Sequence, residues 1–255
     1  MPAPVNLGPP AAVDGWLARL GRGLWAPRCL VCAEPACGPA DLCAPCAAAL
    51  PWMPPACLGC AMPLAAPRPV PAAPTPPDPG ERLCSACRHA PPPLREAHAA
   101  FLYGFPLDRL LPRLKFHRDL AAGRLLAQAM AGALAHAPRP DALVPVPLHR
   151  ARLRQRGYNQ AQELAVPLGR LLGIPVLPRL LRRVRDTAPQ SRLDADARAA
   201  NLRDAFEVPP LRSPPPRVAL VDDVMTTGAT LHAAADALHD AGADRVDAWV
   251  CARAP

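Results

Sequence analysis

Four pairs of cysteines, each spaced Cys-x-x-Cys, lie close together near the start of this 255-residue chain. The pairs are Cys29/Cys32, Cys43/Cys46, Cys57/Cys60 and Cys84/Cys87. Two thiolates on one tight turn supply two of the four ligands of a tetrahedral metal ion. Two such pairs complete the site and leave no open position for catalysis. The eight cysteines therefore predict two structural Zn²⁺ sites. We expect the first pair to join the second and the third to join the fourth, because short loops cost less entropy to close.

A disulfide or redox interpretation of these cysteines is the alternative. The N-terminus has no basic region followed by an apolar core and a cleavage site, and no apolar run approaches the roughly 18 residues of a membrane helix. We therefore expect a cytoplasmic protein without membrane insertion, whose reduced thiolates hold metal. Of the two remaining cysteines, Cys37 is either a spare thiol or a replacement ligand, and Cys251 is interpreted as a small buried apolar residue.

Proline divides the chain into unequal parts. Residues 63–80 are too rich in proline for a helix or a sheet and predict an extended loop, and residues 91–93 mark a boundary. We therefore predict three parts: an N-terminal helix or tail over 1–27, with an amphipathic helix at Val13–Trp25, a double zinc ribbon over 28–93, and an α/β domain over 94–255.

Beyond residue 93, short apolar runs alternate with segments of helical periodicity. The expected strands are Ala99–Tyr103, Ala142–Val146, Pro175–Leu180, Arg217–Val221 and Arg245–Cys251. The expected helices are Leu107–Leu134, Asn159–Leu172 and Thr230–Ala241. Strands that alternate with helices predict an α/β fold with a parallel sheet flanked by helices.

The positive charge of the chain is concentrated in one segment. The formal net charge is +8, and the residues from Pro145 to Arg203 hold 12 arginines against four acids, which accounts for all of it. Drift in a GC-rich genome would also enrich arginine. The concentration in one segment nevertheless points to a bound polyanion, either a nucleic acid or a phosphorylated metabolite.

The most informative stretch follows the apolar run Arg217–Val221. Two adjacent carboxylates, Asp222 and Asp223, lead into a hydroxyl-rich loop and then a helix; the residues after the acids are Val224, Met225, Thr226, Thr227, Gly228, Ala229 and Thr230. Backbone N–H groups and hydroxyls at the positive end of a helix favour a phosphate dianion. Carboxylates suit the hydroxyls of a ribose or a divalent cation. Together they predict a ribose 5-phosphate site at the carboxyl end of a parallel sheet.

The segment Val218–Thr230 resembles the signature of type I phosphoribosyltransferases, in which apolar residues precede Asp-Asp and Thr-Thr-Gly-x-Thr. The resemblance implies that Asp222 and Asp223 are the catalytic acids that clamp the ribose of phosphoribosyl pyrophosphate (PRPP), with Mg²⁺ as cofactor. It implies that residues 224–230 bind PRPP and that Thr226–Thr230 hold its 5-phosphate. It also implies that pyrophosphate meets the turn of Pro147, Leu148, His149 and Arg150, although His149 could equally be a surface turn residue.

A long polar connection over about 181–206 predicts a flexible lid that closes over the ligand and excludes water. Candidate anion-binding residues in and near it are Arg156, Asn159, Gln160, Arg182, Arg185, Thr187 and Gln190. The string from Arg156 to Gln160, the Thr187-x-x-Gln190 motif and the cysteine pairs together resemble the ComF family of competence proteins. That resemblance implies a cytoplasmic bacterial protein associated with the uptake of single-stranded DNA. The proline-rich insertion and Cys37 depart from the family pattern.

Three functions are compatible with these patterns. The first is Mg²⁺-dependent transfer of a phosphoribosyl group from PRPP to an acceptor that the sequence does not identify. The second is a non-catalytic module that holds single-stranded DNA, with PRPP as a regulatory ligand or a vestigial site. Tyr158 is the only aromatic residue of the cationic segment, so base stacking has little support. The third is a structural zinc scaffold, which leaves Asp222–Thr230 unexplained.

Acceptor specificity is expected in a hood over 97–140, where Tyr103, Lys115 and His117 are polar candidates. Lys115 is the only lysine of the chain, and it either neutralises a phosphate or lies on a solvated helix face. Proteins of the DNA-uptake machinery are further candidate partners.

Overall fold

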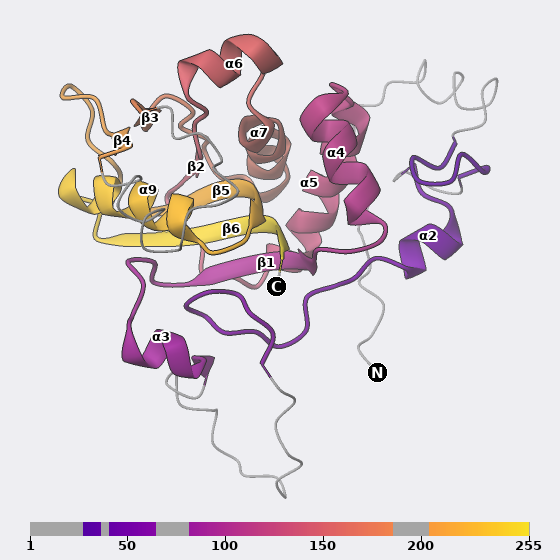
Figure 1. Cartoon of the computed structure of the whole chain (residues 1–255), viewed down its shortest axis with the longest axis horizontal. Helices are drawn as coiled ribbons and strands as arrows, with labels where there is room; N and C mark the ends of the chain where they lie inside the picture. The colour runs from indigo at the N-terminus through magenta and orange to yellow at the C-terminus, as the bar shows by residue number, and fades with distance from the viewer. Residues whose placement is uncertain (1–27, 37–40, 65–81, 186–203, 255) are drawn as a thin grey trace, which may run out of the picture.

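The computed structural model describes residues 28–36, 41–64, 82–185 and 204–254 (Figure 1). Its centre is a sheet of four parallel strands in the order β1-β6-β5-β2. The strands are β1 (Ala97–Leu102), β2 (Ala142–Pro145), β5 (Arg217–Met225) and β6 (Arg245–Arg253). The predicted α/β class with a parallel sheet is therefore confirmed.

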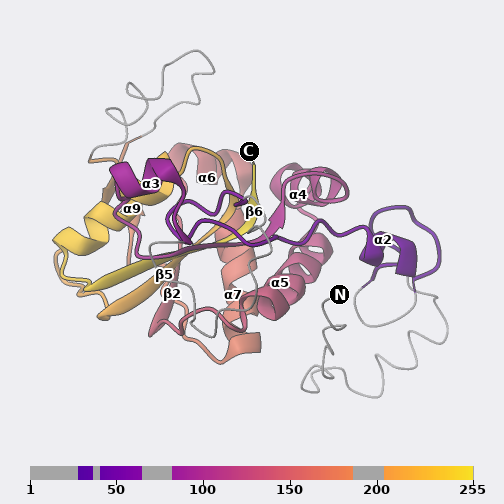
Figure 2. The same ribbon diagram turned by 90° about the horizontal axis from the view of Figure 1, so that it is seen from below.

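Helices cover both faces of this sheet. The helices α5 (Leu120–Leu134) and α7 (Gln160–Leu172) lie on one side, with α4 (Leu107–Phe116) packed against α5, and α9 (Ala229–Asp240) lies on the other side (Figure 2). Alternate residues of a strand point to opposite faces. Val221 and Trp249 accordingly join the core beneath α5 and α7, whereas Leu220 and Val250 join the core beneath α9. Both faces of the central strands are therefore buried, as in other parallel sheets.

The connections leave β2 and β5 in opposite directions. From β2 the chain passes through α7 to Val176, which pairs in parallel with Leu143 on the edge of β2 away from β5. From β5 it passes through α9 to β6, on the other side of β5. The boundary between β2 and β5 is thus a topological switch point. Open parallel sheets bind their ligands outside the carboxyl ends of the strands at such a point.

The cysteine-rich segment covers the free edge of β1. It contains two short helices, α2 (Ala44–Ala48) and α3 (Ser85–His89). Between them, Met53 N donates to Ala100 O at 3.0 Å, and Leu102 N donates to Pro51 O at 2.8 Å. An uncovered edge strand would be a template for unwanted pairing. The residues that precede β1 therefore protect the sheet as well as carrying the thiols.

Three predicted elements need correction. The single helix Leu107–Leu134 is wrong, because α4 ends at Phe116, Arg118 has a φ of +55°, and Asp119 caps α5 by accepting a hydrogen bond from Ala122 N at 3.1 Å. The strand Pro175–Leu180 is wrong, since only the bridge at Val176 forms. The strand from Arg217 does not end before the acids: β5 continues to Met225 and contains both of them.

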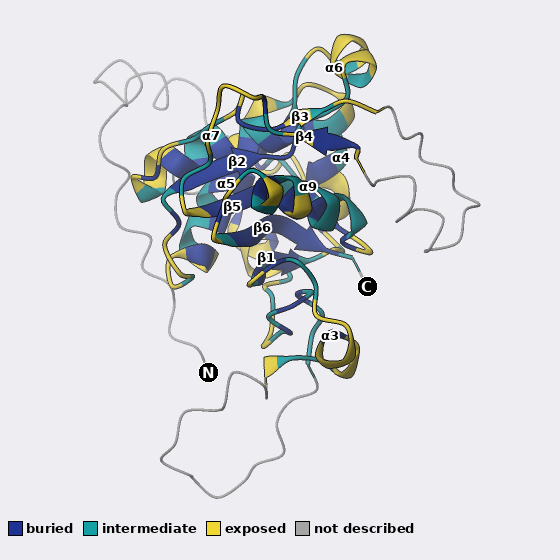
Figure 3. Ribbon diagram, turned by 90° about the vertical axis from the view of Figure 1, so that its left-hand side faces the viewer, coloured by how far each residue is buried: buried dark blue, intermediate teal, exposed yellow. Residues whose placement is uncertain are grey.

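Beyond residue 93, two described features of the structure have no counterpart in the prediction, as is also true of α2 and α3 in the cysteine-rich segment. One is the helix α6 (Arg150–Arg156), which has no buried residue (Figure 3). The other is an antiparallel ribbon of β3 (Arg182–Arg183) and β4 (Phe206–Glu207) at the two ends of the predicted lid. The other expected strands and helices agree with the structure to within a few residues. The predicted helix Val13–Trp25 and most of the proline-rich loop lie outside the described residues.

Candidate functional site

Two clusters of four cysteines form in the predicted order. Cys29, Cys32, Cys43 and Cys46 make the first, and Cys57, Cys60, Cys84 and Cys87 make the second. In each cluster the four Sγ atoms lie within 4.8 Å of one another, with 3.5 Å between Cys32 and Cys43 and 3.8 Å between Cys60 and Cys84. A disulfide would require about 2.0 Å. Zn–S bonds of about 2.3 Å in a tetrahedron separate the sulfurs by about 3.8 Å, so both clusters fit structural zinc.

In each cluster, backbone hydrogen bonds lower the pKa of one thiol and so favour its thiolate form. Burial alone would raise the pKa of Cys29, but backbone hydrogen bonds from three residues of the same cluster region lower it to about 6. Burial is likewise outweighed at Cys57, where backbone hydrogen bonds, the first from Cys84 N at 3.2 Å, lower the pKa to about 7. Burial and neighbouring thiols raise the pKa of Cys46 and Cys87. Because the thiolate is the metal ligand, a bound cation is the natural stabiliser of the remaining sulfurs.

Each cluster is tied to the α/β domain by an arginine. Arg113 of α4 donates through Nη1 to the carbonyl of Leu30 in the first cluster. Arg253, the last residue of β6 and itself buried, donates through Nε to Cys60 O at 2.8 Å and through Nη1 to Met225 O at 3.2 Å. The second cluster is thus hydrogen-bonded, through one side chain, to the end of the strand that carries the acids.

The acid pair lies in the last residues of β5. Asp223 is 4% exposed and Asp222 is partly buried. Asp222 Oδ1 accepts from Asp223 N at 2.9 Å, and Asp223 Oδ1 accepts from Val224 N at 2.9 Å. Burial and the charge of Asp223 raise the pKa of Asp222 well above its usual range. Two neighbouring carboxyl groups in this environment repel each other's charge, and a cation or hydroxyl donors bound to them would relieve that repulsion.

The loop after the acids begins a helix at its positive end. Thr226 and Thr227 are exposed, and Gly228 is the N-cap of α9 with a φ of +82°. Gly228 contributes no side-chain oxygen to the first turn, where Thr227 Oγ1 accepts from Ala229 N at 3.4 Å. Exposed hydroxyls together with the N–H groups of a first helical turn favour an anion. Of the predicted PRPP-binding residues 224–230, Val224 and Met225 lie in β5, with Met225 buried, whereas Thr226, Thr227 and Gly228 form the loop and Ala229 and Thr230 lie in that first turn.

The predicted pyrophosphate turn lies beside the acids. β2 pairs with β5 in parallel, Pro145 opposite Val221, and Val146 N donates to Val221 O at 2.9 Å. The turn of Pro147 and Leu148 follows directly, at the same edge of the sheet as Asp222. His149 caps α6, its Nδ1 accepting from Ala151 N at 3.4 Å, and Arg150 is the exposed first residue of that helix. The fold thus brings together the two predicted halves of the ligand site.

The residues predicted as anion contacts between α6 and α7 hold that junction together. Arg156 donates to the Gln160 side chain, and Gln160 is buried. Asn159 caps α7 by accepting from Ala161 N at 3.1 Å, and its Nδ2 donates to Val146 O at 2.9 Å. Asn159 thereby fixes the turn after β2 to the start of α7.

Of the predicted lid over about 181–206, the structure describes only the two ends, residues up to 185 and from 204 onward. Arg182 is exposed and pairs with Glu207 across the β3–β4 ribbon. Arg185 forms an ion pair with Asp204 at 3.6 Å. Thr187 and Gln190 lie outside the described residues.

Sequence reasoning named Lys115 as a candidate but did not foresee that it faces the acids. Lys115 Nζ lies 3.1 Å from Asp223 Oδ2. Neither expectation for Lys115, a phosphate contact or a solvated helix face, describes this ion pair with a buried carboxylate. No local pattern could reveal it, because the contact joins α4 to a strand far along the chain. Tyr103 and His117, the other hood candidates, are exposed.

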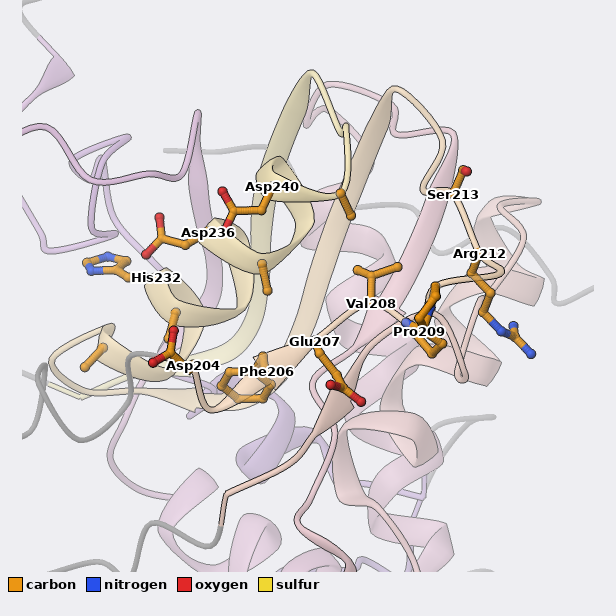
Figure 4. A pocket seen from close by; sticks show the side chains of 15 residues that line it. Asp204, Phe206, Glu207, Val208, Pro209, Arg212, Ser213, His232, Asp236 and Asp240 are labelled. Atoms are coloured by element: carbon orange, nitrogen blue, oxygen red, sulfur yellow. The ribbon is translucent and has the colours of Figure 1, made fainter.

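A separate cavity of about 850 Å³ lies between α9 and residues 204–213 (Figure 4). Its floor is apolar and includes Phe206, Val208, Ala233 and Ala237. Four acids and one arginine also line it: Asp204, Glu207, Asp236, Asp240 and Arg212. This excess of carboxylates disfavours a phosphate or a nucleic acid there. Of the predicted PRPP-binding residues only Ala229 lines this cavity, and the charge of the cavity does not match the polyanion site that the cationic segment predicts.

The fold and these sites define the class of the protein. It is an α/β protein with a type I phosphoribosyltransferase-like parallel sheet and an N-terminal double zinc ribbon. In the described part of the chain, no helix has the length and apolar character needed to span a membrane.

Comparison with known proteins identifies the family. "Competence protein F" of Haemophilus influenzae is 40% identical over 157 residues, covering 58% of this chain and 69% of that protein. "DNA utilization protein YhgH" of Salmonella typhi is 38% identical over 177 residues, covering 67% and 77%. "Competence protein ComFC" of Bacillus subtilis is 30% identical over 152 residues, covering 58% and 60%. No protein-family model matches the chain. The chain belongs to the ComF family.

Proposed function

We propose that this chain binds PRPP with Mg²⁺ at the carboxyl ends of β2 and β5 and transfers its phosphoribosyl group, as part of the use of incoming DNA. One observation carries the proposal: the acid pair, the hydroxyl loop and the turn after β2 meet at the switch point of the sheet. The names of the relatives, which refer to competence and DNA utilization, supply the link to DNA. The arrangement of eight cysteines in two metal-type clusters, with no disulfide among the described residues, favours a cytoplasmic location.

Each part of the site has a distinct task in this proposal. Asp222 and Asp223 accept hydrogen bonds from the ribose hydroxyls. The loop Thr226–Thr230 binds the 5-phosphate through N–H groups and hydroxyls, at the positive end of α9. The turn of Pro147–Arg150 faces the pyrophosphate, and Mg²⁺ would neutralise the charge of that leaving group. The carboxylates also stabilise positive charge that develops on the ribose ring as the bond to pyrophosphate breaks.

The test is calorimetric titration of zinc-loaded protein with Mg²⁺-PRPP. We expect binding by the natural protein and loss of binding in Asp222→Asn/Asp223→Asn. Asp236→Asn/Asp240→Asn is the matched control, because it removes two carboxylates of the chain from the acidic cavity on the far side of α9 and should leave the affinity unchanged. An absence of binding by the folded natural protein would overturn the proposal. Binding would justify a screen for acceptors by pyrophosphate release.

Contact with the backbone of single-stranded DNA is a second candidate function. The observation that favours it is α6, a helix of seven residues with four arginines and no buried residue. Lys and Arg contacts to phosphates give an affinity that falls steeply with salt. We expect Arg152→Ala/Arg154→Ala to weaken oligonucleotide binding and to reduce its salt dependence. Arg212→Ala, which removes a cation from the acidic cavity, is the control. Equal affinity in all three proteins would exclude α6 as the contact surface.

A further inference from the structure

Lys115 places a positive charge on the acid pair from a different layer of the fold. Its Nζ lies 3.1 Å from Asp223 Oδ2, and the two side chains are 34% and 6% exposed. The other oxygen of Asp223 already accepts from Val224 N. Oδ2 is buried and receives no directed hydrogen bond, so its contact with Lys115 is an ion pair. The carboxylate atom that remains for a ligand is therefore the atom that Lys115 occupies.

The position of Lys115 is fixed by its neighbours in α4. The hydroxyl of Tyr158 donates to the carbonyl of Leu114, and the guanidinium of Arg156 lies 5.6 Å from the ring centre of Phe116. The residues on both sides of Lys115 are thus held by the segment that joins α6 to α7. These contacts hold the part of α4 from which the Lys115 side chain extends to Asp223.

The surroundings of the acids show what this charge does. On β5 the neighbours are the two acids themselves, and on β6 the buried thiol of Cys251 is close enough to be affected by the charge of Asp223. Burial and Asp223 raise the pKa of Asp222, and the charge of Lys115 acts against that increase. In the described residues near this edge, Lys115 is the cation paired with the acids, and its charge favours the ionised form of Asp222.

We propose that Lys115 is a positioning residue of the PRPP site that exchanges partners when the ligand binds. This inference rests on the proposed function. In the free protein Lys115 neutralises Asp223. When a ribose hydroxyl takes the Asp223 oxygen, the ammonium moves to the pyrophosphate of the same ligand. The four-carbon stem and freely rotating ammonium of lysine suit such an exchange between two anions. The positive charge of Lys115 thus balances a carboxylate in the free protein and the pyrophosphate in the complex.

Affinity for Mg²⁺-PRPP tests the exchange. Loss of one charged contact should weaken binding by about 10- to 100-fold in Lys115→Ala, whereas Lys115→Arg should retain most of the affinity. Arg109→Ala is the matched control, because it removes a positive charge from the exposed face of the same helix, and it should bind normally. The pH profile adds a readout that a structural role would not change. The acidic limit of binding should move to higher pH in Lys115→Ala, since Asp222 is then protonated more readily.

Because Lys115 is the only lysine, reductive methylation with ¹³C-formaldehyde gives a single lysine signal beside that of the N-terminus. We expect that signal to shift in Asp223→Asn without ligand, and to shift again in the natural protein on addition of Mg²⁺-PRPP. If Lys115→Ala binds Mg²⁺-PRPP as tightly as the natural protein does, with the same pH profile, this inference alone is overturned. Failure of the natural protein to bind would instead overturn the proposed function.

Discussion

Gly228 combines a left-handed backbone angle with close side-chain neighbours, and both disfavour a residue with a Cβ. A Cβ atom at this position would lie 2.7 Å from Met225 Cε and 3.0 Å from His232 Nε2, and the φ angle is +82°. The left-handed conformation alone costs roughly 1–2 kcal/mol for a residue with a Cβ. We expect Gly228→Ala to lower the free energy of unfolding by about 2 kcal/mol or more in urea titrations.

Gly242 provides the control for that experiment. It has a φ of +99°, but a Cβ added there would meet no atom within 4 Å. Gly242→Ala should therefore cost only the backbone term of roughly 1–2 kcal/mol. Equal losses in the two variants would mean that the close contacts around Gly228 are unimportant.

Asp222 makes the free protein less stable as the pH rises. Its pKa in the folded state is raised by burial and by Asp223, so the folded state binds more protons than the unfolded state above about pH 4, near the ordinary Asp pKa. Stability must then fall as the pH increases from there through the raised pKa. We expect Asp222→Asn to raise the urea midpoint at pH 7 and to leave it almost unchanged at pH 4. A lower midpoint at pH 7 would contradict this prediction.

At the scale of elements, the break between α4 and α5 depends on Asp119. This carboxylate caps α5 and also accepts from Arg113 Nε at 2.8 Å, and Arg113 in turn binds the first cysteine cluster. We expect Asp119→Ala to destabilise the protein by about 1–2 kcal/mol, the usual cost of a lost N-cap. Asp119→Asn retains a capping oxygen and should cost less. Thermal unfolding of the two variants measures the difference.

Periodicity predicted the strands and helices whose apolar faces are buried, and it failed where polar contacts decide the structure. The helix α6 has no buried residue, so it has no apolar pattern. Its signals are the caps, His149 at one end and Gly157, with a φ of +86°, at the other. The break before α5 similarly depends on the side chain of Asp119. The apolar run Pro175–Leu180 resembles a strand, but the chain makes only one bridge with β2 there.

For the site, local motifs identified the thiol pairs, the acids and the loop, because each lies within a few residues of sequence. They could not reveal what crosses between layers. Arg253 joins Cys60 to Met225, and Lys115 of α4 faces Asp223 of β5, only because the tertiary fold brings segments far apart in the sequence together.

At the scale of the whole molecule, we expect about two zinc ions per chain in protein purified under reducing conditions, one for each cluster. Native mass spectrometry measures the number. Cys57→Ser should remove one ion and lower the melting temperature, because structural zinc supplies folding energy. Cys251→Ser, which changes a buried thiol outside both clusters, should retain two ions. A single ion in the natural protein would contradict the prediction.

The strand order has a consequence for synthesis of the chain on the ribosome. In the described sheet, β1 pairs with β6 and β2 pairs with β5. Ala97 and Ala142 therefore cannot pair until their partners, Ala248 and Val218, have been synthesised. The thiol clusters close over short stretches and can fold early, whereas the sheet cannot form until residues 217–253 have left the exit tunnel. Until then the apolar strands β1 and β2 are clients for chaperones, and a chain shortened before residue 217 would have no parallel sheet to protect them.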